Sequence, residues 1–503
     1  MELTTALSSP SVSDLEAHFA QFRKQIIGID AEIDTPDGRK PLVYADWVAS
    51  GRMYGPIERR MEELAPFVGN THTETSHCGT LMTRLYHAAQ HKIKAHVGAG
   101  PDDVLIAAGS GMTTVINKLQ RMMGLKLPEA FASRIELAEH ERPVVFVSHM
   151  EHHSNHTSWL ETIADVVVLT PGDDGRCAID ALAEVLPKFA DRPLKIGAFI
   201  AHSNVTGLST PYHELARLMH QAGGLCFVDF AASAPYVAID MHPTDANGQP
   251  DYDARLDAVY FSPHKFLGGP GTPGVLVFDK NLYRNRIPDH PGGGTVVWTN
   301  PWGQHAYLDD IEAREDGGTP PFLQTIRTAL CIDLKDQMGV DRIEAREHQL
   351  VHAAMPRLRA IDGLHVLADT HADRLGIVSF WCEHLHYNLC VRLLNDRFGI
   401  QVRGGCSCAG TYGHYLLHVD PTCSAEAFAA AEQGDHTLML GWIRLSLHPT
   451  MTNAELDYAL NAIEQLATHG EQWAKEYTYD KRSNEWLHPD DANSDVDHLL
   501  TLA

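Results

Sequence analysis

Seven short apolar runs, separated by stretches with helical patterning, constrain the fold of this chain more than any other feature of its sequence. They are continuously apolar rather than alternating, and lie at residues 104–107, 144–148, 166–169, 196–200, 225–228, 258–261 and 274–278. Such runs predict strands of a sheet that helices cover on both faces, and their alternation with helices is typical of βαβ units. We therefore expect an α/β fold with a mostly parallel sheet, whose ligands bind at the carboxyl ends of the strands.

Helical and strand patterns outside this region predict further units. Ser13 and Glu16 have capping-box spacing at the start of an amphipathic helix, and the Gly- and Pro-rich passage 288–321 predicts loops. After a helix over 325–337, a smaller α+β unit follows, with strands at 377–381, 400–402 and 442–447, a helix near 387–396, and a last helix capped by Thr452 and Glu455. We expect four parts: an N-terminal helical segment packing on the small domain (1–34), a large domain (35–322), a small C-terminal domain (323–470) and an acidic tail (471–503).

Charge and composition limit the partners. The 503 residues carry a formal net charge of -25, which works against binding to nucleic acid or to anionic lipid surfaces. The first thirty residues show no targeting signal, and no apolar stretch is long enough to span a bilayer. Nine cysteines without a C-x-x-C pair predict free thiols rather than disulfides or a structural metal site. We expect a cytoplasmic protein that binds no metal, membrane or nucleic acid.

A lysine and a carboxylate follow two of the predicted strands. Lys265 ends the sequence Ser-Pro-His-Lys directly after strand 258–261, and Asp229 comes at the end of the next strand upstream, directly after residues 225–228. A strand-terminal lysine is usually a solvated surface group, and a strand-terminal aspartate is often a simple cap. Together at one sheet edge they suit pyridoxal 5'-phosphate (PLP), whose pyridine nitrogen a buried carboxylate keeps protonated.

Other polar residues are expected at the same edge. Gly111, Met112 and Thr113 begin a predicted helix after strand 104–107, and such a helix start can hold a phosphate group. His152 follows strand 144–148 in a histidine cluster that lacks the spacing of a zinc site. Its imidazole could instead stack on a cofactor and relay protons. Asn204 follows strand 196–200 and could bind a ring hydroxyl.

In this order, these elements resemble the class V aminotransferase family, and within it the cysteine desulfurases and selenocysteine lyases. The likeness runs from residue 44 to about 466. It implies PLP-dependent transferase fold type I, with a seven-stranded sheet in the large domain. It also implies that Lys265 holds the cofactor as a Schiff base, with the other cofactor contacts made by Asp229, Asn204, His152, Gly111, Met112, Thr113, Ser262 and His264. Thr319, in Gly-Gly-Thr-Pro, is implied to reach the phosphate of a neighbouring subunit, and hence a homodimer with shared active sites.

A second element resembles the nucleophile loop of the desulfurases. It reads Arg-Gly-Gly-Cys-Ser-Cys-Ala-Gly from Arg403, and Cys408 falls on the nucleophile position, with Cys406 two residues earlier. A buried inert thiol is the alternative reading of this pair. The resemblance also assigns Arg444 to the substrate carboxylate, and we expect Arg403 and Ser50 to contact the substrate. A cation near the thiol, such as Arg403, favours the thiolate.

Three departures from the family pattern leave the substrate open. Ala232 stands where a glutamine is common, Met112 replaces a second threonine, and Asp46 to Ser50 replace an Asn-Ala-Ala-like element. A stretch around 298–307 looks inserted and could reshape the pocket. The expected reaction is removal of sulfur or selenium from L-cysteine or selenocysteine, giving alanine through a Cys408 persulfide, which a sulfur-acceptor protein could then take. The alternatives are an aminotransferase, racemase or β-lyase that does not use Cys408, and a non-catalytic relative that binds a partner.

Overall fold

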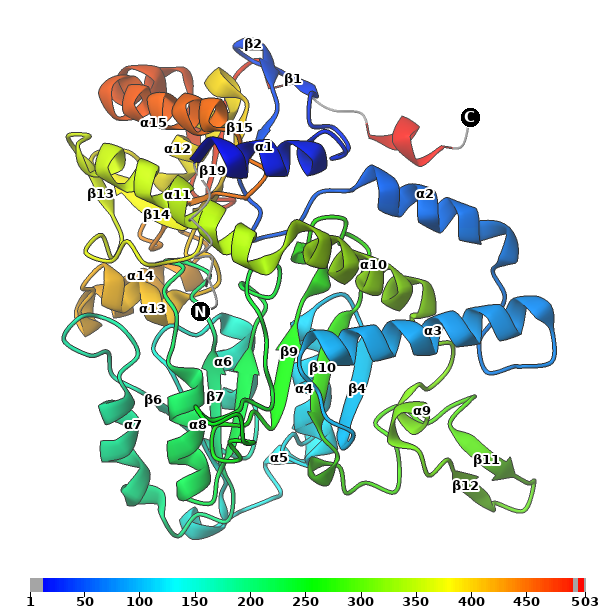
Figure 1. Ribbon diagram of the computed structural model, residues 1–503. Coiled ribbons are helices and arrows are strands. Elements are labelled where there is room, and N and C mark those ends of the chain that lie inside the picture. Colours follow the sequence, from blue (N-terminus) through cyan, green and yellow to red (C-terminus); the bar gives the residue numbers. More distant parts are fainter. Residues whose placement is uncertain (1–11, 492–495, 502–503) are drawn as a thin grey trace, which may run out of the picture.

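The computed structural model describes residues 12–491 and 496–501, and its largest feature is a seven-stranded sheet (Figure 1). The strand order is β4-β10-β9-β8-β7-β5-β6, and β10 alone runs antiparallel to its two neighbours in this sheet. This confirms the predicted α/β fold with a mostly parallel sheet. The bounds are β4 Asp103–Ala108, β5 Val144–Val147, β6 Asp165–Val168, β7 Lys195–Ile200, β8 Leu225–Asp229, β9 Ala258–Phe261 and β10 Gly274–Asp279.

The sheet is apolar on both faces because each strand sends alternate side chains into two separate cores. Leu105 and Phe146 belong to one core, whereas their neighbours Ile106 and Val145 belong to the other. Helices cover each face and supply the other half of each core. They include α4 (Met112–Met122) and α6 (His153–Leu160) on one face, and α7 (Ile179–Val185) and α8 (Tyr212–Gln221) on the other.

The smaller unit is a four-stranded antiparallel sheet in the order β13-β14-β17-β16, packed against helices. Its strands are β13 Leu364–Val366, β14 Ile377–Cys382, β16 Arg403–Gly405 and β17 Trp442–Ser446. Its helices include α11 Val340–Arg359, α12 Tyr387–Phe398 and α15 Asn453–Trp473. The predicted capping box of α15 is present, since the Thr452 hydroxyl accepts from the Glu455 amide and the Glu455 carboxylate accepts from the Thr452 amide.

Two helices join the units. The long helix α10 (Phe322–Met338) packs on α3 (His77–His96) through a small apolar cluster. The N-terminal helix α1 (Val12–Arg23) contacts α11, and Arg23 forms an ion pair with Glu455 at 2.6 Å. The Ser13 side chain lies outside the described part of the structure. Within residues 12–491 and 496–501, no helix is both long and apolar enough to cross a bilayer.

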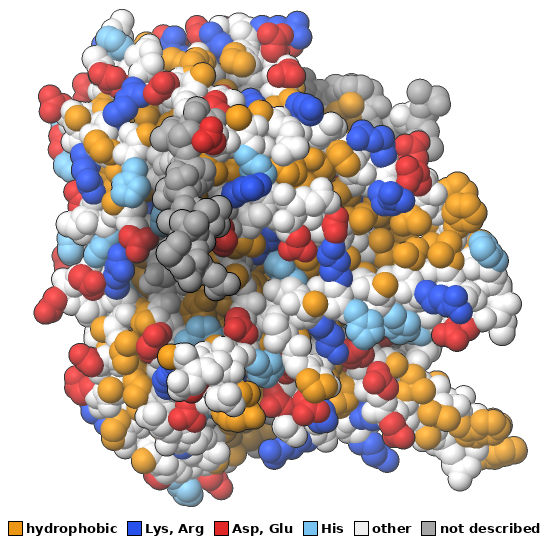
Figure 2. Space-filling view, in the orientation of Figure 1, with side chains coloured by type: hydrophobic (Ala, Val, Ile, Leu, Met, Phe, Trp, Pro, Cys, Tyr) orange, Lys and Arg blue, Asp and Glu red, His pale blue; other side chains and the backbone are white. Residues whose placement is uncertain are grey.

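We expected the whole passage 288–321 to be loop, but part of it has regular secondary structure. It holds a hairpin of β11 (Val296–Thr299) and β12 (His305–Tyr307), followed by the short helix α9 (Ile311–Glu315). The Asn300 side chain accepts from the amides of Trp302 and Gln304 and so closes the turn, a role that propensity alone does not reveal. The hairpin extends away from the rest of the chain and exposes apolar side chains (Figures 1 and 2): Val297, Trp298 and Trp302.

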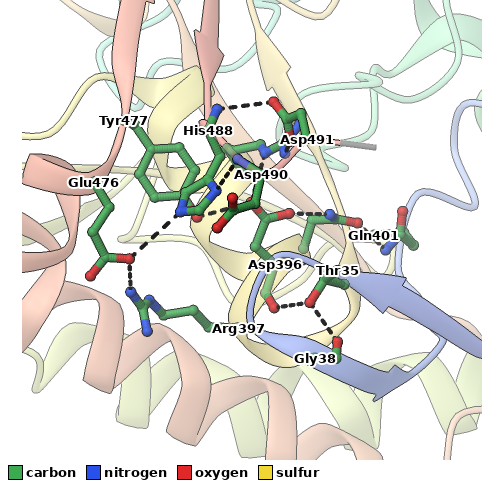
Figure 3. A network of polar contacts seen from close by, with 12 residues as sticks. Thr35, Gly38, Asp396, Arg397, Gln401, Glu476, Tyr477, His488, Asp490 and Asp491 are labelled. Atoms are coloured by element: carbon green, nitrogen blue, oxygen red, sulfur yellow. Dashed lines mark hydrogen bonds and ion pairs between the residues drawn. The ribbon is translucent and has the colours of Figure 1, made fainter. Parts of the chain in front are cut away.

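The expected acidic tail is partly folded. After α15, β18 (Thr478–Asp480) and β19 (Glu485–Leu487) form a hairpin that contacts α12. Figure 3 shows the polar network that attaches this segment: the Tyr477 hydroxyl donates to Asp396 Oδ2 at 2.9 Å, and Arg397 pairs with Glu476 at 2.6 Å. The segment thus contacts the small unit through this polar network and through Tyr477 and Trp486, which pack in or against its apolar core.

One segment, residues 43–51, runs from the small unit to the large one and contains a turn at 47–49. It begins as β3 (Val43–Tyr44), which pairs in parallel with β15 (Ile400–Gln401). The Ala45 carbonyl then accepts from the Ser446 amide of β17, and the Gly51 amide donates to the His264 carbonyl at 2.8 Å. This segment therefore fixes the small unit relative to the turn that carries Lys265.

Candidate active site

A cavity of about 650 Å³ lies where the strand ends of the large sheet meet the small unit. It forms there because the carboxyl ends of β8 and β9 and the N-termini of α4 and α6 converge on one edge of the sheet. All the predicted site residues line it except Ser50 and Thr319. Those that line it are Gly111, Met112, Thr113, His152, Asn204, Asp229, Ser262, His264, Lys265, Arg403, Cys408 and Arg444.

Lys265 lies in the single-turn helix η4 (Pro263–Lys265) that follows β9. Burial lowers the pKa of its ammonium group from 10.5 to about 8, against the opposing attraction of the nearby Asp229 carboxylate. An amine with a pKa near 8 is partly neutral at physiological pH, so it can act as a nucleophile or base.

Asp229 is the last residue of β8 and is buried beside the cavity. Its Oδ1 accepts from the Ala231 amide at 2.8 Å, whereas its Oδ2 is buried and has no hydrogen-bond partner in the described part of the chain. Burial raises the pKa of this carboxyl to about 6. The carboxylate is thus ionised at neutral pH, with one oxygen available to a cationic donor in the cavity.

The N-terminus of α4 forms another wall. Gly109 has φ +59°, and a Cβ there would lie 2.3 Å from Thr114 Oγ1, so the turn into the helix requires glycine. The Met112 amide donates to Ser262 Oγ at 2.9 Å, and the Thr113 and Ser154 hydroxyls are 2.7 Å apart. Amides and hydroxyls therefore converge at a helix start, an arrangement suited to a phosphate group.

His264 and Ser50 lie beside this helix start. Burial and the charge of Lys265 lower the pKa of His264 to about 4, so its ring is neutral at pH 7. The Ser50 hydroxyl donates to the His264 carbonyl at 3.2 Å. The same hydroxyl lies 3.4 Å from His264 Nδ1, so Ser50 contacts the backbone and the ring of a cavity residue without lining the cavity itself.

His152 caps α6, since its Nδ1 accepts from the Ser154 amide at 3.1 Å. Burial, with a further effect of Lys265, lowers the pKa of His152 to about 3. A neutral ring that accepts at Nδ1 carries its proton on Nε2. His152 therefore presents an uncharged imidazole to the cavity.

Asn204 connects the large unit to the cysteine loop. Its side-chain Nδ2 donates to the Ser407 carbonyl at 2.7 Å, and its backbone carbonyl accepts from the Arg444 guanidinium at 3.2 Å. Its Oδ1 is buried without a partner in the described part of the structure. The sequence indicated one role for this side chain, a contact with a ring hydroxyl. The structure adds a second, because the same side chain holds the cysteine loop.

The loop after β16 holds Ser407 and Cys408 in an unusual backbone conformation. Ser407 and Cys408 have φ of +50° and +57°, and the Ala409 amide closes the turn on the Cys406 carbonyl at 2.9 Å. Left-handed conformations cost a residue with a side chain roughly 1–2 kcal/mol each. Besides Asn204, the His153 amide, which donates to the Cys408 carbonyl at 2.7 Å, offsets this cost. Cys408 is exposed and Cys406 is half-buried.

Arg403 and Arg444 meet at the same side of the cavity, with Asp46 between them. Asp46 Oδ1 accepts from the Arg444 guanidinium at 2.9 Å, and Asp46 Oδ2 accepts from Arg403 Nε at 3.0 Å. Sequence reasoning did not assign Asp46 to the site. Its partners lie more than 350 positions away, and no local pattern around residue 46 indicates them.

The outer wall of the cavity contains residues that the sequence did not suggest: Tyr387, Asn388, Met439, Leu440 and Asn484. Asn484 belongs to the turn of the tail hairpin, and its Nδ2 donates to the Tyr387 hydroxyl at 2.8 Å. The aromatic residues Tyr477, Tyr479 and Trp486 were the available signal that this segment folds back. The inserted-looking stretch 298–307 contributes nothing to the cavity lining.

Thr319 lies apart from the cavity of its own chain. Its hydroxyl accepts from Asn70 Nδ2 at 3.2 Å in an exposed position.

Ala231 and Ala232 line the cavity beside Asp229. Position 232, where a glutamine is common in the family, therefore presents only a methyl group to the cavity.

Solved structures share this architecture. The cysteine desulfurase of Thermococcus onnurineus NA1 in its apo form matches with a TM-score of 0.69 and 20% identity, covering 89% of this chain and 98% of that one. The cysteine desulfurase CsdA of Escherichia coli matches with a TM-score of 0.67 and 23% identity over the same shares. These likenesses confirm the predicted fold, PLP-dependent transferase fold type I, with a large sheet domain and a smaller α+β unit.

Sequence comparison agrees with the fold. A probable cysteine desulfurase of Halalkalibacterium halodurans is 29% identical over 422 residues, which are 82% of this chain and 93% of that protein. The cysteine desulfurase of Haloferax volcanii is 26% identical over 404 residues, 78% of this chain and 88% of that protein. The model of the class-V aminotransferases matches residues 44–459. The chain therefore belongs to the class-V aminotransferase family.

Proposed function

We propose that this chain is a PLP-dependent enzyme that removes sulfur from L-cysteine, or selenium from selenocysteine, and gives alanine. The observation that carries the proposal is the shared cavity of Lys265, Cys408 and two arginines. A lysine, a thiol and a carboxylate-binding pair are the three groups that such a reaction needs from the protein. The names of the similar proteins, cysteine desulfurases, point to the same reaction.

The residues around the cavity fit PLP. Asp229 Oδ2 and Asn204 Oδ1, both buried without partners in the described part of the chain, suit the pyridine nitrogen and the ring hydroxyl. The start of α4, Thr113, Ser262 and His264 would hold the phosphate, His152 would stack on the ring, and Lys265 would bind the aldehyde carbon. When bound, PLP supplies an electron sink for the bond that breaks at the substrate's α-carbon.

The protein's own groups then position the substrate and move protons. Arg444, with Arg403 beside it, would bind the α-carboxylate, because a guanidinium pairs well with a carboxylate. Lys265, with its lowered pKa, is neutral often enough to take the α-proton. His152 carries its ring proton on Nε2, so it can relay a proton at the substrate without adding charge.

Cys408 supplies the acceptor for sulfur. Its thiolate would attack the substrate sulfur, forming an S–S bond as the Cβ–S bond breaks, and the β-carbon would keep the bonding pair and be protonated to alanine. Lys265, Arg403 and Arg444 all interact electrostatically with Cys408.

The test is to incubate purified enzyme with L-cysteine and a thiol reductant, and to measure alanine and sulfide. We expect equal amounts of both, and a loss of about a thousandfold or more in Cys408→Ser. Cys406→Ser is the matched control, since it removes a thiol two residues away, and should lose at most about threefold. Both variants should retain the visible absorbance of bound PLP.

Two outcomes would contradict the proposal. If Cys406→Ser is the inactive variant, the nucleophile lies two residues earlier than proposed. If neither variant slows turnover of L-cysteine, or if alanine is not formed, the chain carries out another reaction of its family.

We also propose a homodimer with shared active sites. Thr319 lies outside its own cavity, and the hairpin β11–β12 and the helix η1 (Ala65–Phe67) expose apolar side chains that a second subunit could cover (Figure 2). Light scattering should give twice the chain mass, and Thr319→Ala should weaken PLP binding by about tenfold. A monomer that binds PLP tightly would overturn this arrangement.

The exposed Cys408 loop would let a thiol-bearing acceptor protein take the sulfur.

We place the enzyme in the cytoplasm. The nine free thiols support this location, because disulfides form in oxidising compartments.

A further inference from the structure

Asp46 lies between the two arginines of the proposed carboxylate-binding site. One of its oxygens contacts Arg444 and the other contacts Arg403, with N–O distances of 2.9 to 3.0 Å. Arg444 is buried, at 3% exposure of its side chain, whereas Arg403 is half exposed. Asp46 therefore already binds, through its own carboxylate, both guanidinium groups that the substrate carboxylate would need.

The backbone around Asp46 leaves this carboxylate little freedom. The residue before it hydrogen-bonds both β15 and β17, through Gln401 and Ser446, and the Gly51 amide is bound to the His264 carbonyl. The Val48 amide also donates to Ser446 Oγ at 3.4 Å. Asp46 thus lies on a segment fixed at both ends. It is almost buried and does not itself line the cavity, so it acts on an incoming ligand through the two arginines.

Asp46 and the two arginines form one charged cluster, with Lys265, Cys408 and Arg52 as its charged or titratable neighbours. Two guanidinium groups bring two positive charges, and Asp46 removes one. The Tyr44 hydroxyl also lies here, donating to the Asp46 carbonyl, and burial raises the pKa of Tyr44 to about 12, so it is uncharged. The arginine pair therefore keeps one positive charge in excess, the charge that one carboxylate balances.

We propose that Asp46 determines substrate specificity by setting this charge. With Asp46 in place, the site accepts an amino acid through a single carboxylate and disfavours a ligand that places a second negative charge against Arg403. Without it, Arg403 becomes a free cation beside Arg444, and dianionic ligands gain an additional partner. The inference rests on the proposed function, in which these arginines receive the substrate carboxylate.

The experiment compares acetate with malonate, the smallest pair of a mono- and a dicarboxylate. Their dissociation constants are measured on the PLP-loaded enzyme by calorimetry, and their inhibition constants against L-cysteine turnover. The quantity compared is the ratio of the malonate affinity to the acetate affinity. In Asp46→Asn, which keeps the size of the side chain, this ratio should rise about tenfold, or ~1.4 kcal/mol. Asp46→Glu, which keeps the charge, should retain the wild-type ratio.

Two further variants separate local charge from other effects. Asp34→Asn removes the same charge from an exposed position in β1 (Glu32–Thr35), and should leave the ratio unchanged. Arg403→Gln removes a charge of the opposite sign at the site, and should shift the ratio toward acetate. This variant also keeps the test valid if Asp46→Asn does not fold.

The proposal is overturned if Asp46→Asn weakens or strengthens both ligands equally, because Asp46 would then be only a positioning residue for the arginines. It is also overturned if Asp34→Asn shifts the ratio as much. Calorimetry needs no turnover, so a shifted ratio in an enzyme that releases no sulfur from cysteine would count against the proposed function and not against the charge-setting role of Asp46.

Discussion

The inner and outer halves of the cavity are built in different ways. The inner half, with Lys265, Asp229 and His152, consists of residues that lie at, or a few residues after, the ends of strands of the large sheet and are closely surrounded by protein. The outer half, with Arg403 and Cys408, is more exposed and is assembled from the small unit, the segment 43–51 and the tail hairpin. The difference suggests that burial in the inner half tunes the cofactor chemistry, whereas contacts between distant segments in the outer half select the substrate.

The largest expected effect tests the inner half. Lys265→Ala should reduce turnover by about a thousandfold or more, since it removes both the cofactor link and the base. Borohydride reduction of the wild-type enzyme should attach PLP to the peptide that contains Lys265. Absorbance, mass spectrometry of the peptides and the rate of alanine formation measure these effects.

Lys335 is the matched comparison for this labelling. It is also buried with a lowered pKa, about 7, but its Nζ donates to the carbonyls of Ala234 and Val237 outside the cavity. Label on Lys335 instead of Lys265 would show that burial alone decides which lysine reacts, and would overturn the site.

A second prediction concerns pH. Because burial lowers the pKa of Lys265 to about 8, the rate at which cofactor-free enzyme captures PLP should rise from pH 7 to 8 and level off near pH 9. His152 and His264, with pKa values lowered to about 3 and 4, stay neutral throughout this range and add no inflection. Stopped-flow absorbance gives the profile.

Asp229→Asn sharpens the pH experiment. The Asp229 carboxylate raises the pKa of Lys265 and so opposes the effect of burial. Removing its charge should move the inflection below pH 8, even if PLP binds more weakly. A rate that still climbs about tenfold per pH unit above pH 9 would mean that Lys265 titrates like a solvated lysine.

The smallest expected effect tests how the outer half is supported. Tyr477→Phe removes the hydroxyl that donates to the fully buried Asp396, and should lower the free energy of unfolding by about 1–2 kcal/mol. Tyr479→Phe is the control, since that hydroxyl donates to Asn484 near the surface and should matter less. Urea denaturation measures both.

PLP affinity should not change in either tyrosine variant, because the tail contacts the outer half of the cavity only. An equal loss of cofactor affinity and stability in Tyr477→Phe would mean that the two halves are not independent.

The strand ends illustrate what could be predicted. Continuous apolar runs located all seven strands of the large sheet to within a residue or two, and so located Lys265 and Asp229 at its edge. The prediction was weaker where side chains close a turn, as Asn300 does in the hairpin that we expected to be loop. It was also weaker in the tail, where composition concealed the aromatic residues that pack on α12.

The sequence by itself determined the sheet, the family resemblance and the order of the groups along it, because strand periodicity and short motifs are local properties of a chain. Only the tertiary structure decided that Asp46 lies between Arg403 and Arg444, that Asn204 holds the cysteine loop, and that the tail completes the outer wall. Each of these contacts joins residues about 100 to 400 positions apart. Their formation depends on how the two units pack together, and no local pattern of residues encodes that packing.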